Sequence, residues 1–276
     1  DAPSLVALDK RTGRVVAVDD AGIGPRLLHG QWSSPALGTA GGRKLVVFGG
    51  GDGVCYAFEA LASVPPEPVK LKTVWTFDAV PPEYKVFGDM DRATHYCRGD
   101  LRRSDALNKS NDGTFAGMSE IIATPVFLDG RVYVAIGRDP EHGRGRGALH
   151  CIAADGRGDL TTSGRVWTYQ GLDRTLSTVS VAGGLLYVSD VAGRLHALDA
   201  RTGECLWIHE AHSRTLGSTL VADGRVYMPT DKGLWILAAG REKKVFGHGD
   251  FDGPLWARPV AGNRTLFLTS RTRLWA

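Results

Sequence analysis

An all-β fold, a β-propeller of four-stranded antiparallel blades, is predicted by three observations on the sequence. A short pattern recurs at aligned positions 179, 219 and 259, spaced by 40 residues, with wider gaps upstream at positions 35 and 125. Each repeat holds four short runs rich in β-branched and aromatic residues, separated by Gly turns, and Gly contributes 36 of the 276 residues. A four-stranded sheet cannot cover its own faces, so such repeats stack as blades around an axis.

The four runs follow one another in the same order in every repeat. First runs lie at 33–37, 123–127, 177–181, 217–221 and 257–260, and second runs at 45–48, 132–135, 186–188, 226–228 and 266–268. Third runs lie at 55–58, 149–152, 195–198 and 234–237, with copies at 5–8 and 274–276. Fourth runs lie at 74–77, 166–169 and 206–209, with weaker copies at 14–19 and 243–248. Because apolar spacing of 3.6 residues is missing from these runs, a helical solenoid is not favoured.

Composition excludes several classes of protein. Hydrophobic residues make up 43% and charged residues 23%, as in ordinary globular proteins. The net charge of +3 is too small to favour nucleic acid or an anionic membrane, and no apolar run is long enough to span a bilayer. The four cysteines form neither a CxxC motif nor an adjacent pair. We therefore expect no nucleic-acid partner and no membrane span.

A motif between the third and fourth runs has a clear physical logic. Residues 7–13 read ALDKRTG, and residues 197–203 read ALDARTG and are followed by Trp207. The Asp side chain can accept hydrogen bonds from the turn backbone, and the Gly can take a positive φ. The Trp is placed to fill the gap between blades, where its N–H needs a partner. The first copy has Ala17 in place of the Trp, whereas Trp167 is kept after a longer turn.

These residues resemble the A-x-D-x-x-T-G-x-x-x-W motif of PQQ-like propeller repeats, and the resemblance covers nearly the whole chain apart from 79–118. The family includes quinoprotein dehydrogenases, an outer-membrane-assembly lipoprotein and many secreted or periplasmic proteins of no known activity. The chain is most similar to the non-catalytic, outer-membrane-assembly-lipoprotein-like and uncharacterised bacterial members. The resemblance implies a periplasmic or secreted location.

One propeller domain is expected over residues 1–276, with about five to six blades' worth of strands. We predict a partial blade at 1–20, blades at 32–78, 119–170, 172–211 and 212–250, a partial blade at 253–276, and an inserted loop at 79–118. The runs do not fill a whole number of blades, and the chain starts at Asp1 without a signal peptide. The family resemblance implies an eight-bladed ring, so we expect an upstream propeller segment to supply the missing strands.

Alternate connections of an up-and-down blade lie on the same side of the ring. The connections between second and third strands, and those between blades, collect nearly all the irregular sequence, and we call this side the loop-rich face. Function tends to reside on loops held by a rigid scaffold. The predicted binding residues are His29, Trp32, Glu120, Asp139, Glu141, His142, Arg174 and His212. The insertion at 79–118 is either a docking loop or lid, or a tolerated insert.

A weak metal site is predicted at Asp139, Glu141 and His142, which place two carboxylates and an imidazole within four residues. With Glu120 nearby, such a set could hold a divalent cation, calcium being the candidate. The alternative is a polar loop with solvated charges, favoured by neighbouring Arg residues that compete for the carboxylates. No other cofactor is expected.

Three functions are compatible with the sequence. The first is a non-catalytic scaffold that binds a protein partner, or the missing propeller segment, through the loop-rich face. The second is a quinoprotein-type oxidoreductase that binds PQQ and calcium; the resemblance then implies an adjacent-cysteine disulfide, which is missing, and a calcium held by Glu, Asn and Asp. The third is hydrolase or lyase chemistry around His142 and Glu141, although no GxSxG, HExxH or phosphate-binding loop supports it. The first function is favoured.

Overall fold

The computed structural model describes residues 2–27, 30–84, 120–139 and 146–276. Within these residues the chain is almost entirely β, and its strands form six sheets. Two 3-10 helices of three residues each complete the regular structure, η1 (Gly24–Arg26) and η2 (Pro82–Tyr84). The prediction of an all-β fold is confirmed.

The sheets follow one another along the chain, and most of their neighbouring strands are antiparallel. The first contains β1 (Val6–Leu8), β2 (Val15–Asp19) and β6 (Val69–Leu71); the second contains β3 (Ala36–Ala40), β4 (Arg43–Gly49), β5 (Val54–Glu59) and β7 (Thr73–Asp78), with β11 (Gly158–Asp159) outside. The third contains β8 (Val126–Leu128), β9 (Arg131–Ile136), β10 (Ala148–Ala153) and β12 (Arg165–Tyr169).

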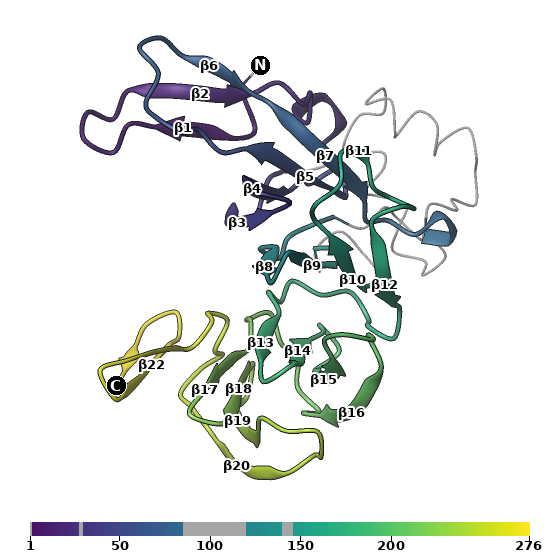
Figure 1. Cartoon of the computed structure of the whole chain (residues 1–276). Coiled ribbons are helices and arrows are strands. Elements are labelled where there is room, and N and C mark those ends of the chain that lie inside the picture. Colours follow the sequence, from purple (N-terminus) through teal and green to yellow (C-terminus); the bar gives the residue numbers. More distant parts are fainter. Residues whose placement is uncertain (1, 28–29, 85–119, 140–145) are drawn as a thin grey trace, which may run out of the picture.

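The second half of the chain repeats the same order more regularly. The fourth sheet contains β13 (Ser180–Ala182), β14 (Leu185–Ser189), β15 (Arg194–Asp199) and β16 (Cys205–Glu210); the fifth contains β17 (Leu220–Ala222), β18 (Arg225–Thr230), β19 (Gly233–Ala238) and β20 (Val245–Gly249). The last contains β21 (Val260–Gly262), β22 (Thr265–Thr269) and β23 (Leu274–Trp275). The sheets fan out in chain order along an arc, with the N-terminal and C-terminal sheets at its two ends (Figure 1). These are propeller blades; the blade number of the complete ring stays a prediction.

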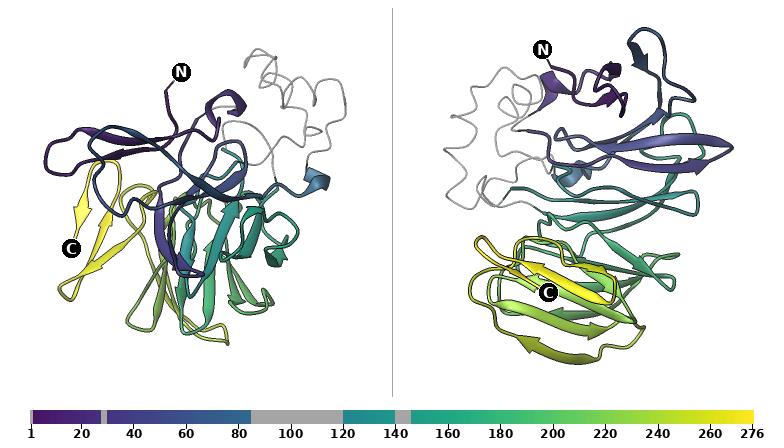
Figure 2. Two further views of the ribbon diagram at one scale, coloured as in Figure 1. Left: turned by 45° about the horizontal axis from the view of Figure 1, so that its top comes forward. Right: turned by 90° about the vertical axis from the view of Figure 1, so that its left-hand side faces the viewer.

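The core lies between the sheets rather than in one central mass. Successive sheets stack face to face (Figure 2, right), and separate clusters of buried side chains fill the spaces between the second and third, third and fourth, and fourth and fifth sheets. Gly38 shows how closely they approach, because a Cβ at this position would lie 2.2 Å from the Phe127 ring in the next sheet. Both faces of a middle sheet are therefore buried, which accounts for the nearly continuous apolar residues in its strands.

Tryptophan side chains on the outer strands join each sheet to the next. The indole Nε1 of Trp75 donates to the backbone oxygen of Ala154 (3.1 Å), that of Trp167 to Ala200 (3.2 Å) and that of Trp207 to Gly240 (3.0 Å). Each acceptor lies in the turn between the third and fourth strands of the following sheet. The predicted role of these tryptophans, which fill the gap between blades, is confirmed.

Two short strands, β6 and β11, are not predicted by the sequence runs. Each precedes the outer strand of its own blade and pairs in parallel with the outer strand of the preceding sheet. Ala17 occupies the place of the missing tryptophan in the first sheet and lies opposite Val69 of β6. The strand backbone thus covers an edge that would otherwise leave unpaired N–H and C=O groups.

Hydroxyl side chains tie the blades together near the axis. The residue directly before each aligned first-strand position is Ser34, Thr124, Thr178, Ser218 or Arg258. The backbone N–H of Thr124 donates to Thr178 Oγ1 (3.0 Å), and that of Thr178 donates to Ser218 Oγ (2.9 Å). A hydroxyl is therefore a structural requirement at this position in the middle blades, whereas Arg258 departs from it.

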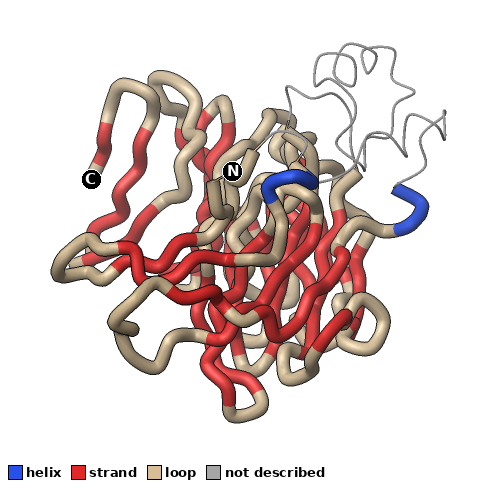
Figure 3. The backbone as a smooth tube through the Cα atoms, turned by 90° about the horizontal axis from the view of Figure 1, so that it is seen from above, coloured by secondary structure: helices blue, strands red, loops and turns tan. Residues whose placement is uncertain are grey.

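The loop-rich face is the end of the sheets at which both 3-10 helices lie (Figure 3). It also carries the connections between second and third strands, such as 190–193 and 231–232. Among the described residues, no helix is long and apolar enough to cross a membrane.

Candidate functional site

The predicted binding residues are distributed around the loop-rich face rather than gathered in one cavity. Trp32 is 49% exposed, His212 is exposed with a φ of 49°, and Arg174 is half-buried. Glu120 and Asp139 lie on the third sheet's side of the face. His29, Glu141 and His142 lie outside the described residues.

Glu120 lies at the base of the connection that carries Asp139. Its backbone exchanges two hydrogen bonds with Gly137, with N···O distances of 2.6 and 3.0 Å. The Glu120 and Arg138 side chains are both only 1% exposed, so two groups of opposite charge are buried at this point. Within the described part of the chain, no three His, Cys, Asp or Glu side chains are grouped to hold a metal ion. The metal site at Asp139, Glu141 and His142 stays a prediction.

Asp190 is the centre of a buried polar network in the connection between β14 and β15. Its Oδ2 accepts from Arg194 Nε (2.9 Å) and contacts His196 Nε2 (3.1 Å), while the backbone N–H of Asp173 donates to the same oxygen (3.1 Å). Burial alone would raise the pKa of Asp190, but the hydrogen bonds from His196 and Arg194 outweigh it and lower that pKa. The ionised carboxylate therefore holds this loop against the preceding blade-to-blade connection.

Asp52 holds the corresponding loop of the second sheet. Arg26 Nε, from η1, donates to its Oδ2 (2.9 Å), and the Tyr56 hydroxyl donates to the same oxygen (2.6 Å). Gly50 makes room for this arrangement, because a Cβ there would lie 2.1 Å from Asp52 Oδ1. Burial and the nearby carboxylate raise the pKa of Tyr56, so the phenol remains a donor.

Asp231 plays the same part in the fifth sheet. Arg214 Nε, from the preceding connection, donates to its Oδ2 (3.0 Å), and Trp256 Nε1, from the following connection, donates to its Oδ1 (2.6 Å). The backbone N–H of Asp231 also donates to the Arg214 oxygen (2.9 Å). One carboxylate thus fixes two connections at once.

We call Asp52, Asp190 and Asp231 the carboxylate latches. Each lies between the second and third strands of its sheet and binds an Arg, which comes from the preceding connection for Asp52 and Asp231 and from the first residue of β15 for Asp190. They are not among the binding residues predicted from the sequence. The signal was present, because each is an acid in the second-to-third connection of a repeat. Their chemistry is structural: acids that accept from guanidinium, phenol or indole groups hold the loops in place.

Large apolar side chains occupy the same place in every repeat, in the connection that leads to the first strand. The residues three positions before the aligned first-strand positions are Trp32, Ile122, Leu176, Leu216 and Trp256. The three aliphatic ones are partly buried, whereas Trp32 is 49% and Trp256 is 38% exposed. The loop-rich face therefore presents two aromatic side chains to solvent from a rigid base.

His150 is buried in the third sheet and has no freedom to act as a proton carrier. Its Nε2 contacts the backbone oxygen of Ala79 (2.7 Å), and its Nδ1 contacts Thr168 Oγ1 (2.9 Å). Burial lowers its pKa to about 4. This histidine is a packing residue.

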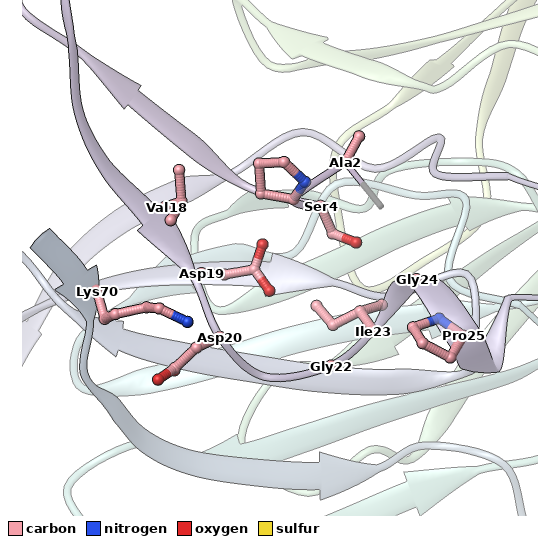
Figure 4. A pocket seen from close by; sticks show the side chains of 11 residues that line it. Ala2, Ser4, Val18, Asp19, Asp20, Gly22, Ile23, Gly24, Pro25 and Lys70 are labelled. Atoms are coloured by element: carbon pink, nitrogen blue, oxygen red, sulfur yellow. The ribbon is translucent and has the colours of Figure 1, made fainter. Parts of the chain in front are cut away.

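Two pockets are present that none of the three latch carboxylates lines. The larger, of about 750 Å³, lies at the N-terminal sheet, where Asp19, Asp20 and Lys70 face a wall that includes Ile23 and Pro25 (Figure 4). The Asp19 carboxylate accepts from the backbone N–H of Leu5 (2.8 Å). The smaller pocket, of about 220 Å³, lies between β7 and β12. It is lined by the acids Asp78 and Glu83 as well as by His150 and Thr168, and the ring nitrogens of His150 contact Thr168 Oγ1 and the Ala79 oxygen rather than either carboxylate.

Comparison with known proteins agrees with the repeat analysis. The model of the family described as "Outer membrane protein assembly factor BamB" matches residues 157–244. No curated protein matches the chain. The fold is similar to that of BamB from Moraxella catarrhalis, with 17% identity, a TM-score of 0.62, and coverage of 96% of this chain and 63% of that one.

Two further structures share the fold. Quinohemoprotein alcohol dehydrogenase from Comamonas testosteroni has 14% identity and a TM-score of 0.60, covering 92% of this chain and 41% of that one. The computationally designed Ika8 protein has 10% identity and a TM-score of 0.55, covering 96% and 61%. The chain thus spans less than two thirds of the length of each of these structures. The repeat motif and the family match over residues 157–244 support the PQQ-like repeat propeller family, and the solved structures share the fold.

Proposed function

We propose that this propeller is a non-catalytic scaffold that binds a protein partner through its loop-rich face. The observation that carries the proposal is the pairing of rigid latches with exposed aromatic side chains. Asp231 fixes Trp256 directly, and Asp52 fixes the connection in which Trp32 lies, because Arg26 belongs to that connection.

Exposed tryptophans on a preorganised surface are typical of protein interfaces. A Trp that is already held in place loses little conformational entropy on binding, and Trp is enriched among the residues that dominate interface energies. The latch carboxylates are occupied by hydrogen bonds within the fold. The exposed groups in the described part of this face are therefore suited to binding a partner, which supports the scaffold function.

Site-specific photocrosslinking in cells tests this proposal. A photoreactive phenylalanine analogue replaces Trp32 on the loop-rich face, and the same analogue replaces Arg201, which is exposed in a turn on the opposite face. We expect a discrete protein adduct from position 32 and none from position 201. Equal labelling from both positions, or none from position 32, contradicts the proposal.

The alternative is a quinoprotein-type oxidoreductase that binds PQQ and calcium, and the fold shared with the alcohol dehydrogenase favours it. The described residues do not fit the implied Glu, Asn and Asp ligand set. Asn263, the only asparagine among them, lies in the β21–β22 turn, on the face opposite the latches, with a φ of 50°. Quantifying quinone and calcium in the purified protein decides the matter, because stoichiometric PQQ contradicts the scaffold.

A periplasmic or secreted location belongs to the same proposal. It is supported by the resemblance to PQQ-like repeat proteins that lie outside the cytoplasm. Cell fractionation, with antibody detection of the native protein, tests it. Recovery in the cytoplasmic fraction contradicts this location and leaves the binding proposal to be judged by crosslinking.

A further inference from the structure

The C-terminal part of the loop-rich face combines the exposed Trp256 with a concentration of arginines. The Arg271 guanidinium lies over the Trp256 ring, 5.6 Å from its centroid. Arg258, two residues after Trp256, is exposed, and Arg214 is nearly half exposed although it binds Asp231. We call Arg214, Trp256, Arg258 and Arg271 the Trp256 patch.

Arg258 is the residue that marks this patch as more than ordinary surface. Its aligned positions in the other repeats hold Ser34, Thr124, Thr178 and Ser218, two of which accept a hydrogen bond from the preceding blade. Arg258 therefore lacks the hydroxyl that the other repeats have at this position and carries a positive charge instead. Arg258 and Arg271 make no salt bridge within the described residues. Two cations are therefore available to an outside ligand.

We propose that the Trp256 patch binds an acidic segment of a partner protein, a peptide that carries Glu or Asp beside an apolar residue. This inference rests on the proposed function and names the chemistry of its ligand. Guanidinium groups donate two parallel hydrogen bonds to a carboxylate, and the exposed part of the Trp256 indole can pack against an apolar side chain. Asp231 and Arg214 form an ion pair next to the Trp256 Nε1, so Arg258 and Arg271 supply the net charge of the patch.

The patch is also built to be rigid. Trp256 Nε1 is anchored on Asp231 (2.6 Å), and the neighbouring Leu255 is buried, with its backbone N–H donating to the Thr230 oxygen (3.0 Å). Binding therefore orders mainly the arginine side chains and the peptide itself, which limits the entropic cost.

The test uses a fluorescein-labelled peptide with alternating Glu-Glu-Leu units, titrated into the whole protein and followed by fluorescence anisotropy. Comparison probes are the same peptide with Lys in place of Glu and an oligothymidylate of equal net charge. We expect saturable binding of the Glu peptide, no binding of the Lys peptide, and weaker binding when NaCl is raised from about 0.05 to about 0.5 M.

Three variants and one control locate the site. Arg258→Ser, which restores the residue of the preceding repeat, and Arg271→Gln should each weaken binding about threefold. Trp256→Ala should weaken it about tenfold. Arg201→Gln removes one exposed charge from the opposite face and should leave binding unchanged. Thermal unfolding of each variant checks that it is folded; the two arginine variants alter exposed side chains only.

Several results would overturn the inference: no saturable binding of the Glu peptide, equal binding of the Lys peptide, tighter binding of the oligothymidylate, or arginine variants that bind like the original protein. A persistent crosslink from position 32 together with failed peptide binding overturns only the acidic ligand. Loss of that crosslink overturns the proposed function itself.

Discussion

The indole N–H of Trp167 donates to the backbone oxygen of Ala200 in the next blade, across 3.2 Å. Ala200 belongs to the ALDARTG turn, so the motif of one blade receives the tryptophan of the blade before it. The same relation joins Trp207 to Gly240. The motif therefore specifies the turn within its own blade, and this turn also binds the tryptophan of the blade before it.

Replacing Trp75 by Phe tests the energetic weight of this contact. Trp75 is fully buried, and its N–H satisfies the Ala154 oxygen. The variant leaves a buried carbonyl without its donor and a small void, so the free energy of unfolding should fall by about 2–3 kcal/mol. Urea unfolding measures the change. Trp32→Phe, at an exposed position, is the control and should change it by less than about 0.5 kcal/mol.

Two glycines of the same motif separate backbone strain from packing. Gly13 and Gly203 both have a positive φ, of 73° and 74°. A Cβ at Gly13 meets nothing within 4 Å, whereas a Cβ at Gly203 would lie 2.6 Å from the Trp167 ring. Gly13→Ala should therefore cost about 1 kcal/mol, from backbone strain alone.

Gly203→Ala should cost about 2 kcal/mol more than Gly13→Ala, because the Trp167 ring must also move. Equilibrium unfolding of the two variants in parallel measures the difference. Equal costs would show that the tryptophan does not pack against the turn of the next blade.

Protonation of His150 should contribute to the pH dependence of the free energy of unfolding. The buried imidazole has a pKa of about 4 instead of 6.5, because burial disfavours its charged form. The unfolded chain takes up this proton below about pH 6.5 and the folded chain only near pH 4, so stability falls as the pH falls through that window. We expect a loss of about 2–3 kcal/mol between pH 7 and pH 4 from this group.

Replacing His150 by Leu should flatten this part of the curve, whatever its effect at pH 7. Urea unfolding at several pH values measures the slope. Leu37→Ala, at an exposed position without a titratable side chain, should leave the slope unchanged. An unaltered slope in the Leu variant would show that another group titrates in this range.

The Asp190 latch should control the local stability of its loop. Asp190→Asn weakens the bonds to Arg194 and His196 and leaves buried donors poorly matched, at a cost of about 2–4 kcal/mol. The Val191 amide, which donates to the Arg174 oxygen, should exchange faster with deuterium. Asp223→Asn, whose carboxylate is almost fully exposed, should have little effect on either measurement. An unchanged Val191 exchange rate would contradict the latch.

Some of the candidate site was visible in the sequence and some was not. Trp32 and the irregular connections were identified because they break a regular repeat. Trp256 stood in one of these connections but was not chosen as a binding residue. The carboxylate latches were missed because a single Asp in a short loop reads as ordinary turn chemistry; only its burial and its Arg partner distinguish it.

The blade could be predicted from the sequence alone. Alternating apolar residues, Gly turns and the ALDARTG motif indicate four strands and their order, because these signals act within about 40 residues, the length of one repeat. Contacts between segments far apart in the chain needed the tertiary structure: β6 beside β2, Trp75 against Ala154, and Trp256 held by Asp231. No local pattern encodes such pairs, because the stacking of whole sheets sets which side chains meet.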